Sequence, residues 1–301
     1  MVIIFFVTGM FGSTLEFLLR NYTAENDTVQ GYITDDGSLH SYQKGYHPSN
    51  KSMMEVWHSE SVSDILKRVK ILTPVYPWSD AKLDWIVDNF PVDLATSKNI
   101  FVCAKDFRDA ELNMLFQFYK IAKGVLNMGL TIFCGNNSQC IKNWNKKYTH
   151  WSEMEPWELR EWSSIFYSEW ITEWIDPSLT ISHLEKSILN NVDVLENLED
   201  AFLSIAKYCN LTVINDDSRF SFIKEWTEKQ QYIVEEFNLI DQIVEKTINK
   251  ENFEWIDARL CFISEAIIQR RLRVRGYEIA CYKLNTFPTN SAELYTLLEK
   301  T

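Results

Sequence analysis

Apolar residues run without interruption near the start of the chain, and a turn containing glycine follows them. Residues 2–8 read VIIFFVT, a run that is typical of a strand buried in a parallel sheet. Residues 9–14 contain two glycines, and residues 14–22 have the apolar spacing of a helix. The pattern therefore predicts a strand, a tight turn and a helix in direct succession.

The pattern then alternates between helical and apolar extended stretches. It predicts helices at about 59–68, 79–89 and 108–127, and strands within 69–76 and at 99–104. This alternation indicates an α/β fold with a doubly wound, mostly parallel sheet. In such folds ligands bind at the carboxyl ends of the strands.

The remaining stretches are a polar segment and a helical second half. Residues 23–56 are polar and rich in turn-forming residues, which predicts a long loop. Further helices are expected as a pair between 183 and 211, as one or two helices over 218–248, and at 254–275. No linker separates these parts. We expect one domain over 1–301, with core sheet elements in about 1–130, a helical elaboration over 131–275 and a closing strand at about 277–287.

Composition excludes some classes of protein. Apolar residues make up 46% of the 301 residues and charged residues 24%, which is typical of a soluble globular chain. The formal net charge is -12, so a broad surface for nucleic acid is not expected. An anionic ligand would need a local basic pocket.

The cysteines and the first residues bear on the compartment. The six cysteines show no paired spacing for a disulfide framework or a zinc site, which indicates reduced thiols in a cytosolic setting. The first apolar run lacks a positively charged start and is too short for a signal peptide or a membrane span. We therefore expect a cytoplasmic chain without a membrane span, and we leave its oligomeric state open.

The turn at 9–14 is the first candidate site. Unpaired N–H groups and the dipole at the start of a helix both favour an anion. The nucleotide-hydrolysing pattern G-x-x-x-x-G-K-[ST] is not matched, because Val7 takes the place of its first glycine and Ser13 that of its lysine. A tight turn with no ligand is the alternative.

The second candidate site follows the strand at 99–104. Lys105 and Arg108 come directly after this strand, and Asn113 lies in the second turn of the following helix. Two cations and an amide at the same sheet edge as the first turn could bind a second phosphate. The alternative is a solvated basic helix start with Asp109 near the N-cap.

We call the turn at 9–14 the first corner and the stretch from Lys105 to Asn113 the second corner. Together the two corners resemble the sulfotransferases that use 3'-phosphoadenylyl sulfate (PAPS) and release 3',5'-ADP (PAP). The family's first motif is a strand, K/R-S-G-T-T and a helix, where this chain has the run Met10, Phe11, Gly12, Ser13, Thr14. Its second motif is R-[DN]-P-[RK]-D with a Ser eight residues after the Arg. This chain has Lys105 to Asp109 there, and Asn113 at the Ser position.

The resemblance implies a P-loop-like fold and in-line transfer of SO₃ from PAPS to a hydroxyl or amine of a small molecule or sugar. The cofactor-binding residues that it implies are Gly9, Met10, Phe11, Gly12, Ser13, Thr14, Lys105, Arg108, Asn113, Arg275 and Gly276. Arg275 and Gly276 would replace a late R-K-G element of the family. A solvated helix end that favours cations is the other interpretation of that arginine-rich stretch.

Two catalytic groups are not fixed by the motifs. Met10 stands where the family has its loop cation, and a positioned cation would stabilise the charge that builds on the leaving oxygen. For the base we select His47 and His58, because imidazole titrates near neutral pH. Two other functions stay open, namely a non-catalytic nucleotide-binding or interaction protein and a P-loop small-molecule kinase.

Overall fold

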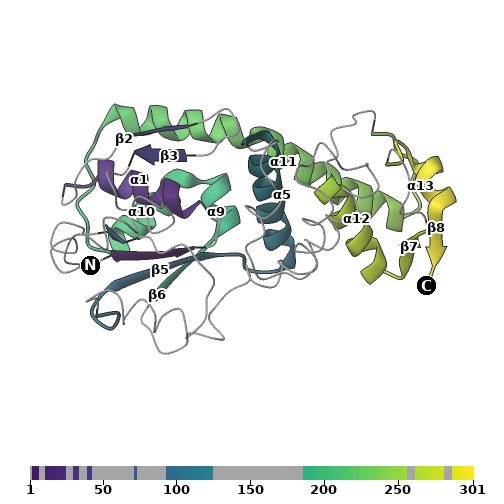
Figure 1. Ribbon diagram of the computed structural model, residues 1–301, viewed down its shortest axis with the longest axis horizontal. Helices are drawn as coiled ribbons and strands as arrows, with labels where there is room; N and C mark the ends of the chain where they lie inside the picture. Colours follow the sequence, from purple (N-terminus) through teal and green to yellow (C-terminus); the bar gives the residue numbers. More distant parts are fainter. Residues whose placement is uncertain are drawn as a thin grey trace, which may run out of the picture. The chain divides into compact units, whose positions relative to one another are not determined.

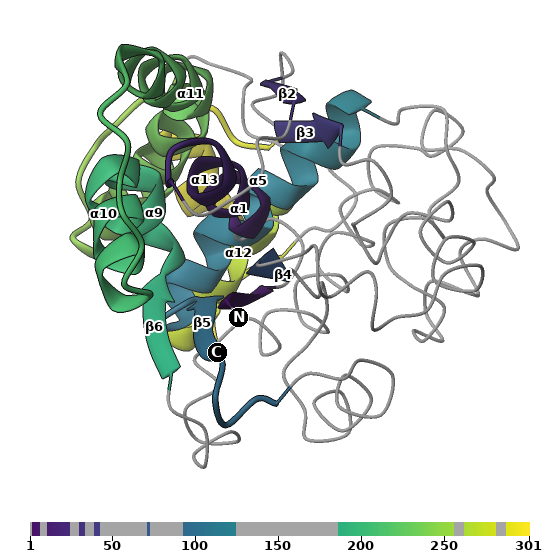
Figure 2. The ribbon, with the colours of Figure 1, turned by 90° about the vertical axis from the view of Figure 1, so that its left-hand side faces the viewer.

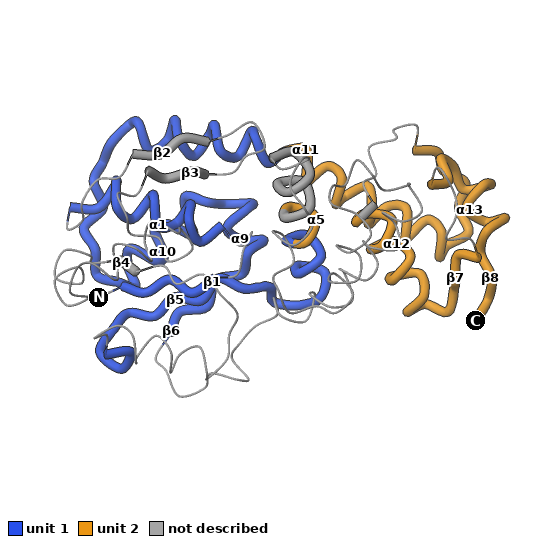
Figure 3. Tube along the Cα trace, in the orientation of Figure 1, with its two compact units in different colours: residues 1–113, 173–230 blue, residues 114–172, 231–301 orange. Residues whose placement is uncertain are grey.

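The structure is a computed structural model that describes residues 2–6, 11–24, 30–33, 39–42, 71–72, 93–124, 186–255, 262–280 and 287–301. The chain divides into two compact units (Figure 3). Unit 1 comprises residues 1–113 and 173–230, and unit 2 comprises residues 114–172 and 231–301. Two of the boundaries, after Asn113 and after Gln230, fall inside helices.

Unit 1 contains a parallel β-sheet. Its strands are β1 (Val2–Phe6), β4 (Ile71–Leu72), β5 (Lys98–Cys103) and β6 (Lys186–Asn190). They lie in the order β4-β1-β5-β6, and every neighbouring pair is parallel. The predicted mixed α/β class with a parallel sheet is therefore confirmed. Strand β1 is described over Val2–Phe6, and the last two residues of the predicted strand, 7 and 8, lie outside the described residues.

The two central strands form the apolar core of unit 1. All five residues of β1 are buried, as are the last five of β5. Phe5 and Phe101 are paired in register, and their rings stack with centroids 4.5 Å apart. Cross-strand aromatic pairs of this kind stabilise a sheet beyond main-chain hydrogen bonding. This pair ties β1 to β5 along their middle.

Three helices cover one face of the sheet (Figures 1 and 2). They are α1 (Gly12–Asn21), α9 (Asn191–Glu196) and α10 (Leu198–Tyr208). Helix α1 contacts β1 and α10, while α9 and α10 contact β6. In Figure 1 the three helices lie above the sheet. The helix predicted at 14–22 is confirmed as α1, which begins two residues earlier.

Helix α1 is buried over most of its surface and carries a charged pair into the core. Glu16 and Arg20, four residues apart, form an ion pair of 2.9 Å with side chains 1% and 7% exposed. A buried charge is tolerated when it is paired and hydrogen-bonded. The pair accounts for the two ionisable residues of a helix whose other side chains are uncharged.

Helix α11 (Asp217–Ile248) is a single helix, which settles the choice between one and two that the sequence left open. Its first part belongs to unit 1 and packs on α1. The Phe222 ring stacks on Phe17 at 4.6 Å, and Trp226 is completely buried. Aromatic contacts therefore hold the start of α11 against α1.

One prediction for unit 1 is refined and one is wrong. The polar segment 23–56, predicted to be rich in loops, contains an antiparallel pair, β2 (Gln30–Ile33) and β3 (Leu39–Tyr42). The helix expected from residue 183 is replaced by β6. Its sequence KSILN has only two adjacent apolar residues, a pattern too short to separate strand from helix. Pairing with β5 decides in favour of the strand.

Unit 2 contains the ends of two long helices and a small C-terminal region. Helix α5 (Phe107–Gly124) enters it at Met114 and α11 at Gln231. The C-terminal elements are α12 (Phe262–Val274), β7 (Tyr277–Ile279), α13 (Ser291–Leu297) and β8 (Leu298–Lys300). Strands β7 and β8 pair antiparallel.

The structure modifies the predictions for unit 2. The closing strand at 277–287 is confirmed for its first three residues, and its partner is β8 rather than the main sheet. Of the helix predicted at 254–275, α12 covers Phe262–Val274; Glu254 forms a β-bridge with Asn290, and residues 256–261 lie outside the described residues. The sequence made no prediction for α13 and β8.

The helices predicted at 59–68 and 79–89 lie outside the described residues, as do most of 131–185. Among the helices that the structure does describe, none combines the length and the apolar character needed to cross a bilayer.

Cys209, at the end of α10, tests the burial of this core. Burial raises the pKa of its thiol to about 11. At pH 8 the reactive thiolate is then on the order of one part in a thousand of the folded protein. We expect iodoacetamide to label Cys209 far more slowly in the folded protein than after urea unfolding, as measured by mass spectrometry. Equal labelling rates in the two states would contradict the burial of this cysteine.

Candidate functional site

The two predicted corners leave the sheet at the same edge. Strands β1 and β5 are parallel neighbours, and Phe6, the last residue of β1, pairs with Val102 near the end of β5. The chain therefore leaves both strands at their carboxyl ends, about one strand spacing apart. In this sheet β4 lies on one side of β1 and β5 on the other, so the strand order changes direction between β1 and β5. Open α/β sheets bind ligands at such a switch point.

At the first corner, Phe11 caps helix α1 through its main chain. Its φ of 61° lies in the left-handed region, and its carbonyl accepts hydrogen bonds from the N–H groups of Thr14 and Leu15 at 3.0 and 3.1 Å. Within the described part of the chain the N–H groups of Gly12 and Ser13 have no acceptor. Unpaired N–H groups at a helix start can bind an anion, whereas the N–H of Thr14 is already used within the helix start.

Gly12 is required by its neighbour in the core. A Cβ built at this position would lie 2.1 Å from the ring of Phe6, which is itself buried. No side chain fits at that distance. The glycine therefore allows the end of β1 to pack directly under the first turn of α1, whether or not a ligand binds there.

The Phe11 side chain is buried rather than presented to a ligand. Its ring meets Trp226 of α11 edge-on with centroids 5.4 Å apart. A phenylalanine in the left-handed region costs about 1–2 kcal/mol of backbone strain, which the burial of the ring offsets. The conformation of the turn is thus fixed by two aromatic side chains, Phe6 below it and Phe11 beside it.

At the second corner, Asp106 caps helix α5, which begins at Phe107. The Asp106 side chain accepts a hydrogen bond from the N–H of Asp109 at 3.1 Å, and its carbonyl accepts from Ala110. The sequence placed Asp109 near the N-cap, but the N-cap is Asp106, three residues earlier. Asp109 lies inside the first turn of the helix.

The two cations of this corner differ in their surroundings. Lys105 is exposed, and within the described residues it makes no hydrogen bond or ion pair. The Arg108 side chain is half exposed and lies 4.0 Å from the Asp109 carboxylate. Lys105 is therefore the cation that could bind an anion without breaking an existing ion pair.

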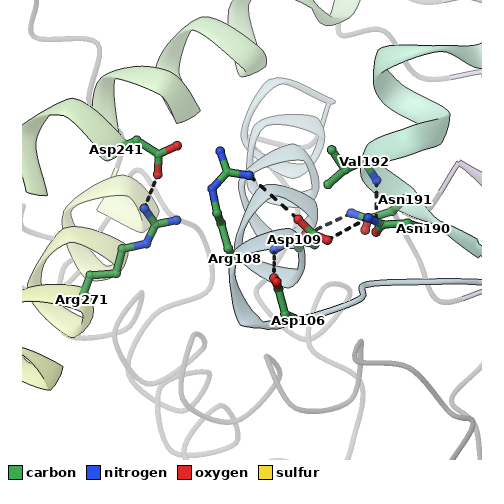
Figure 4. Close-up of polar contacts among 8 residues, drawn as sticks. All are labelled: Asp106, Arg108, Asp109, Asn190, Asn191, Val192, Asp241 and Arg271. Atoms are coloured by element: carbon green, nitrogen blue, oxygen red, sulfur yellow. Dashed lines mark hydrogen bonds and ion pairs between the residues drawn. The ribbon is translucent and has the colours of Figure 1, made fainter. Parts of the chain in front are cut away.

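Asp109 connects this corner to the neighbouring strand (Figure 4). Its carboxylate accepts a hydrogen bond from the side chain of Asn190 at 2.8 Å, and its carbonyl accepts one from Asn191 at 3.0 Å. Burial raises the pKa of the Asp109 carboxyl above its ordinary value, and the hydrogen bond from Asn190 opposes that shift. The start of α5 is thereby attached to the junction of β6 and α9.

Asn113, predicted to bind the second phosphate, is completely buried. In the described part of the chain neither its amide nitrogen nor its amide oxygen has a hydrogen-bond partner. Lys105 and Arg108 are exposed while Asn113 is enclosed, so the structure does not present the three side chains on one surface.

Arg275 and Gly276 belong to unit 2, at the end of α12. Arg275 lies 3.9 Å from Glu245, and Gly276 has a φ of +81°, the left-handed conformation that commonly ends a helix. The neighbouring side chains Arg271 and Arg273 pair with Asp241 and Glu278 (Figure 4 shows the first of these pairs).

Several predicted site residues lie outside the described part of the chain: Gly9, Met10, His47 and His58. Among the residues that the structure covers, no group of His, Cys, Asp or Glu side chains could hold a metal ion.

Asn190 and Asn191 are site residues that the sequence did not reveal. Asn190 accepts a hydrogen bond from the N–H of Val192 and so acts as the N-cap of α9. Tandem asparagines before an apolar run are a helix-start signal, which could have been recognised. Their contacts with Asp109 span more than eighty positions of sequence and could not.

Comparisons of this chain with models of protein families, with curated proteins and with solved structures found no match.

The packing of Phe6 on Gly12 can be tested by substitution. Gly12→Ala places a methyl group against the ring, and we expect it to destabilise the protein by about 1–3 kcal/mol in urea unfolding. In a Phe6→Ala background the space is open, so the same substitution should cost much less. Equal costs in both backgrounds would mean that this contact is not what requires the glycine.

Asp109 gives a second test, through pH. Its pKa is raised, so the folded state loses stability as the pH rises from 3.8 through the folded pKa and regains it on acidification. Asp109→Asn removes this dependence but keeps an acceptor for Asn190. We therefore expect the wild type to gain stability relative to Asp109→Asn between about pH 7 and about pH 4.5 in urea unfolding.

Asp216→Asn is a control of opposite sign. Hydrogen bonds from Ser218 lower the pKa of Asp216, so its contribution is lost as the pH falls. If the two variants show the same trend with pH, the assignment for Asp109 is wrong.

Proposed function

We propose that this chain is a sulfotransferase-like protein with a P-loop-like fold, which binds PAPS at the carboxyl edge of the unit 1 sheet. The adjacency of β1 and β5 carries the proposal, because it brings the N-terminus of α1 and the Lys105 corner to one sheet edge. A ligand with two anionic groups on opposite sides of a nucleoside suits two such corners.

In this proposal the free N–H groups of Gly12 and Ser13 bind the phosphosulfate. Lys105, with Arg108, binds the 3'-phosphate. The acceptor hydroxyl or amine of a small molecule or sugar attacks sulfur, the bond from sulfur to the bridging oxygen breaks, and PAP leaves. The acceptor's proton passes to a base, for which His47 and His58 are our candidates.

A binding protein without transferase activity is the second candidate. It is favoured by the apolar character of the first corner, where Met10 replaces the family's cation and the Phe11 ring is buried against Trp226. Amides alone can bind an anion, but the loss of a positioned charge costs about a hundredfold to a thousandfold in rate. Ligand binding and sulfuryl transfer must therefore be measured separately.

Thermal unfolding tests the site. We expect 3',5'-ADP to raise the melting temperature more than ADP or ATP with Mg²⁺, because a ligand that binds only the folded state stabilises it by mass action. Lys105→Ala should abolish that increase. Lys207→Ala is the matched control, since Lys207 is also exposed but lies on α10, away from the proposed site. The next residue, Tyr208, contacts Lys98 at the amino end of β5, so this part of α10 lies near the amino end of the sheet.

The outcomes separate the candidates. Binding of 3',5'-ADP without sulfuryl transfer to a panel of hydroxyl and amine acceptors supports the second candidate. A preference for ATP with Mg²⁺ indicates a kinase. A shift with 3',5'-ADP that is unchanged in Lys105→Ala removes the site assignment.

A further inference from the structure

Asn113 presents a buried amide whose hydrogen bonds are unaccounted for. The residue is 0% exposed, and across the described residues both its Nδ2 and its Oδ1 lack a partner. Leaving a buried donor or acceptor unsatisfied costs about 1–3 kcal/mol, so such groups nearly always have a partner in folded proteins.

A second buried amide oxygen without a described partner belongs to Asn191. Asn191 is also 0% exposed, and its Nδ2 donates to the main-chain carbonyl of Asp109 at 3.0 Å. Its Oδ1 has no partner among the described residues. Two buried asparagines on different helices thus leave one amide nitrogen and two amide oxygens unsatisfied.

The carbonyl of Asp109 brings the two residues together. In an α-helix this carbonyl accepts the hydrogen bond of the N–H four residues later, which in α5 is that of Asn113. The Nδ2 of Asn191 and the main-chain nitrogen of Asn113 therefore share one acceptor and lie within about 6 Å of each other. Asn191 therefore contacts α5 at the turn over which the Asn113 side chain extends.

The unsatisfied groups define the chemistry of a molecule that bridges them. It must donate to the Oδ1 atoms of Asn113 and Asn191 and accept from the Nδ2 of Asn113. An anion cannot donate to the two oxygens, and a metal cation cannot accept from the nitrogen. An ionised Asp109 carboxylate, which accepts from Asn190, does not meet these needs because it has no proton to donate to the amide oxygens. Water has two donors and two acceptors and matches the set.

We propose that Asn113 and Asn191 enclose one internal water molecule, which bridges α5 to α9. It donates to the two amide oxygens and accepts from the Asn113 nitrogen. Together with the hydrogen bonds of Asp109 to Asn190 and Asn191, it fixes the first two turns of α5 against the junction of β6 and α9. This water site is a positioning element for the Lys105 corner and is independent of the proposed ligand.

A double-mutant cycle in urea unfolding tests the bridge. Leucine has the branching of asparagine without its polar atoms, so we use Asn113→Leu, Asn191→Leu and the double variant. If the water is shared, each single variant should raise the unfolding constant about tenfold or more, because the partner amide loses its hydrogen bond. The double variant should then be less destabilised than the product of the two single effects, by about threefold or more.

Asn99 supplies the matched control. It is completely buried at the other end of β5, where its amide donates to the carbonyls of Leu94 and Ser97 at 2.8 and 3.3 Å. Asn99→Leu should be destabilising as well, but its effect should multiply independently with that of Asn113→Leu. This separates a shared water from general damage to a buried amide.

Two results overturn the proposal. If Asn113→Leu leaves stability unchanged or increases it, the amide has no partner to lose. If the effects of the Asn113 and Asn191 variants multiply independently, the two residues share nothing. Should the leucine variants not fold, a high-resolution crystal structure of the wild type decides the question. A water peak within hydrogen-bond distance of both amides supports the proposal, and direct contact of the amides or a different bound molecule refutes it.

Discussion

Main-chain pairing between β1 and β5, reinforced by the stacked rings of Phe5 and Phe101, determines where the candidate site can lie. Parallel neighbours end at the same edge, so the start of α1 and the start of α5 lie at the same edge of the sheet. Each corner then receives its shape from core contacts. Phe6 and Phe11 set the first turn, and the hydrogen bonds of Asp109 set the second. The geometry of the candidate site therefore follows from the packing of the sheet.

The same residues combine structural and potential binding roles to different degrees. Gly12 is needed for packing, yet its N–H has no acceptor among the described residues. Lys105 is the opposite case, because it is exposed and contributes no ion pair to the described fold. Asn113 lies between these extremes, since it is enclosed but unsatisfied. Substitution of Lys105 should therefore change ligand affinity without changing stability, whereas substitution of Gly12 should change both.

Long apolar or strongly periodic segments were predictable from the sequence. The elements β1, α1, β5, α5 and α11 lie within a few residues of their predicted bounds. Strand β6 was not predictable, because the sequence KSILN has no hydrophobic periodicity of its own and forms a strand only through pairing with β5. The contacts of Asp109 with Asn190 and Asn191 were also beyond reach, since they depend on that pairing. The exposed cations of the second corner were predictable, because only the end of one strand had to be located in the sequence.

The ion pair of Glu16 with Arg20 links the helical form of α1 to its burial. Residues four apart lie close together on one face of an α-helix, whereas in an extended chain they are about 13 Å apart and do not pair. An extended segment buried in the core would desolvate two separate charges at a large cost in free energy, whereas the helix buries them as a pair. The pair therefore disfavours non-helical conformations of this segment inside the core.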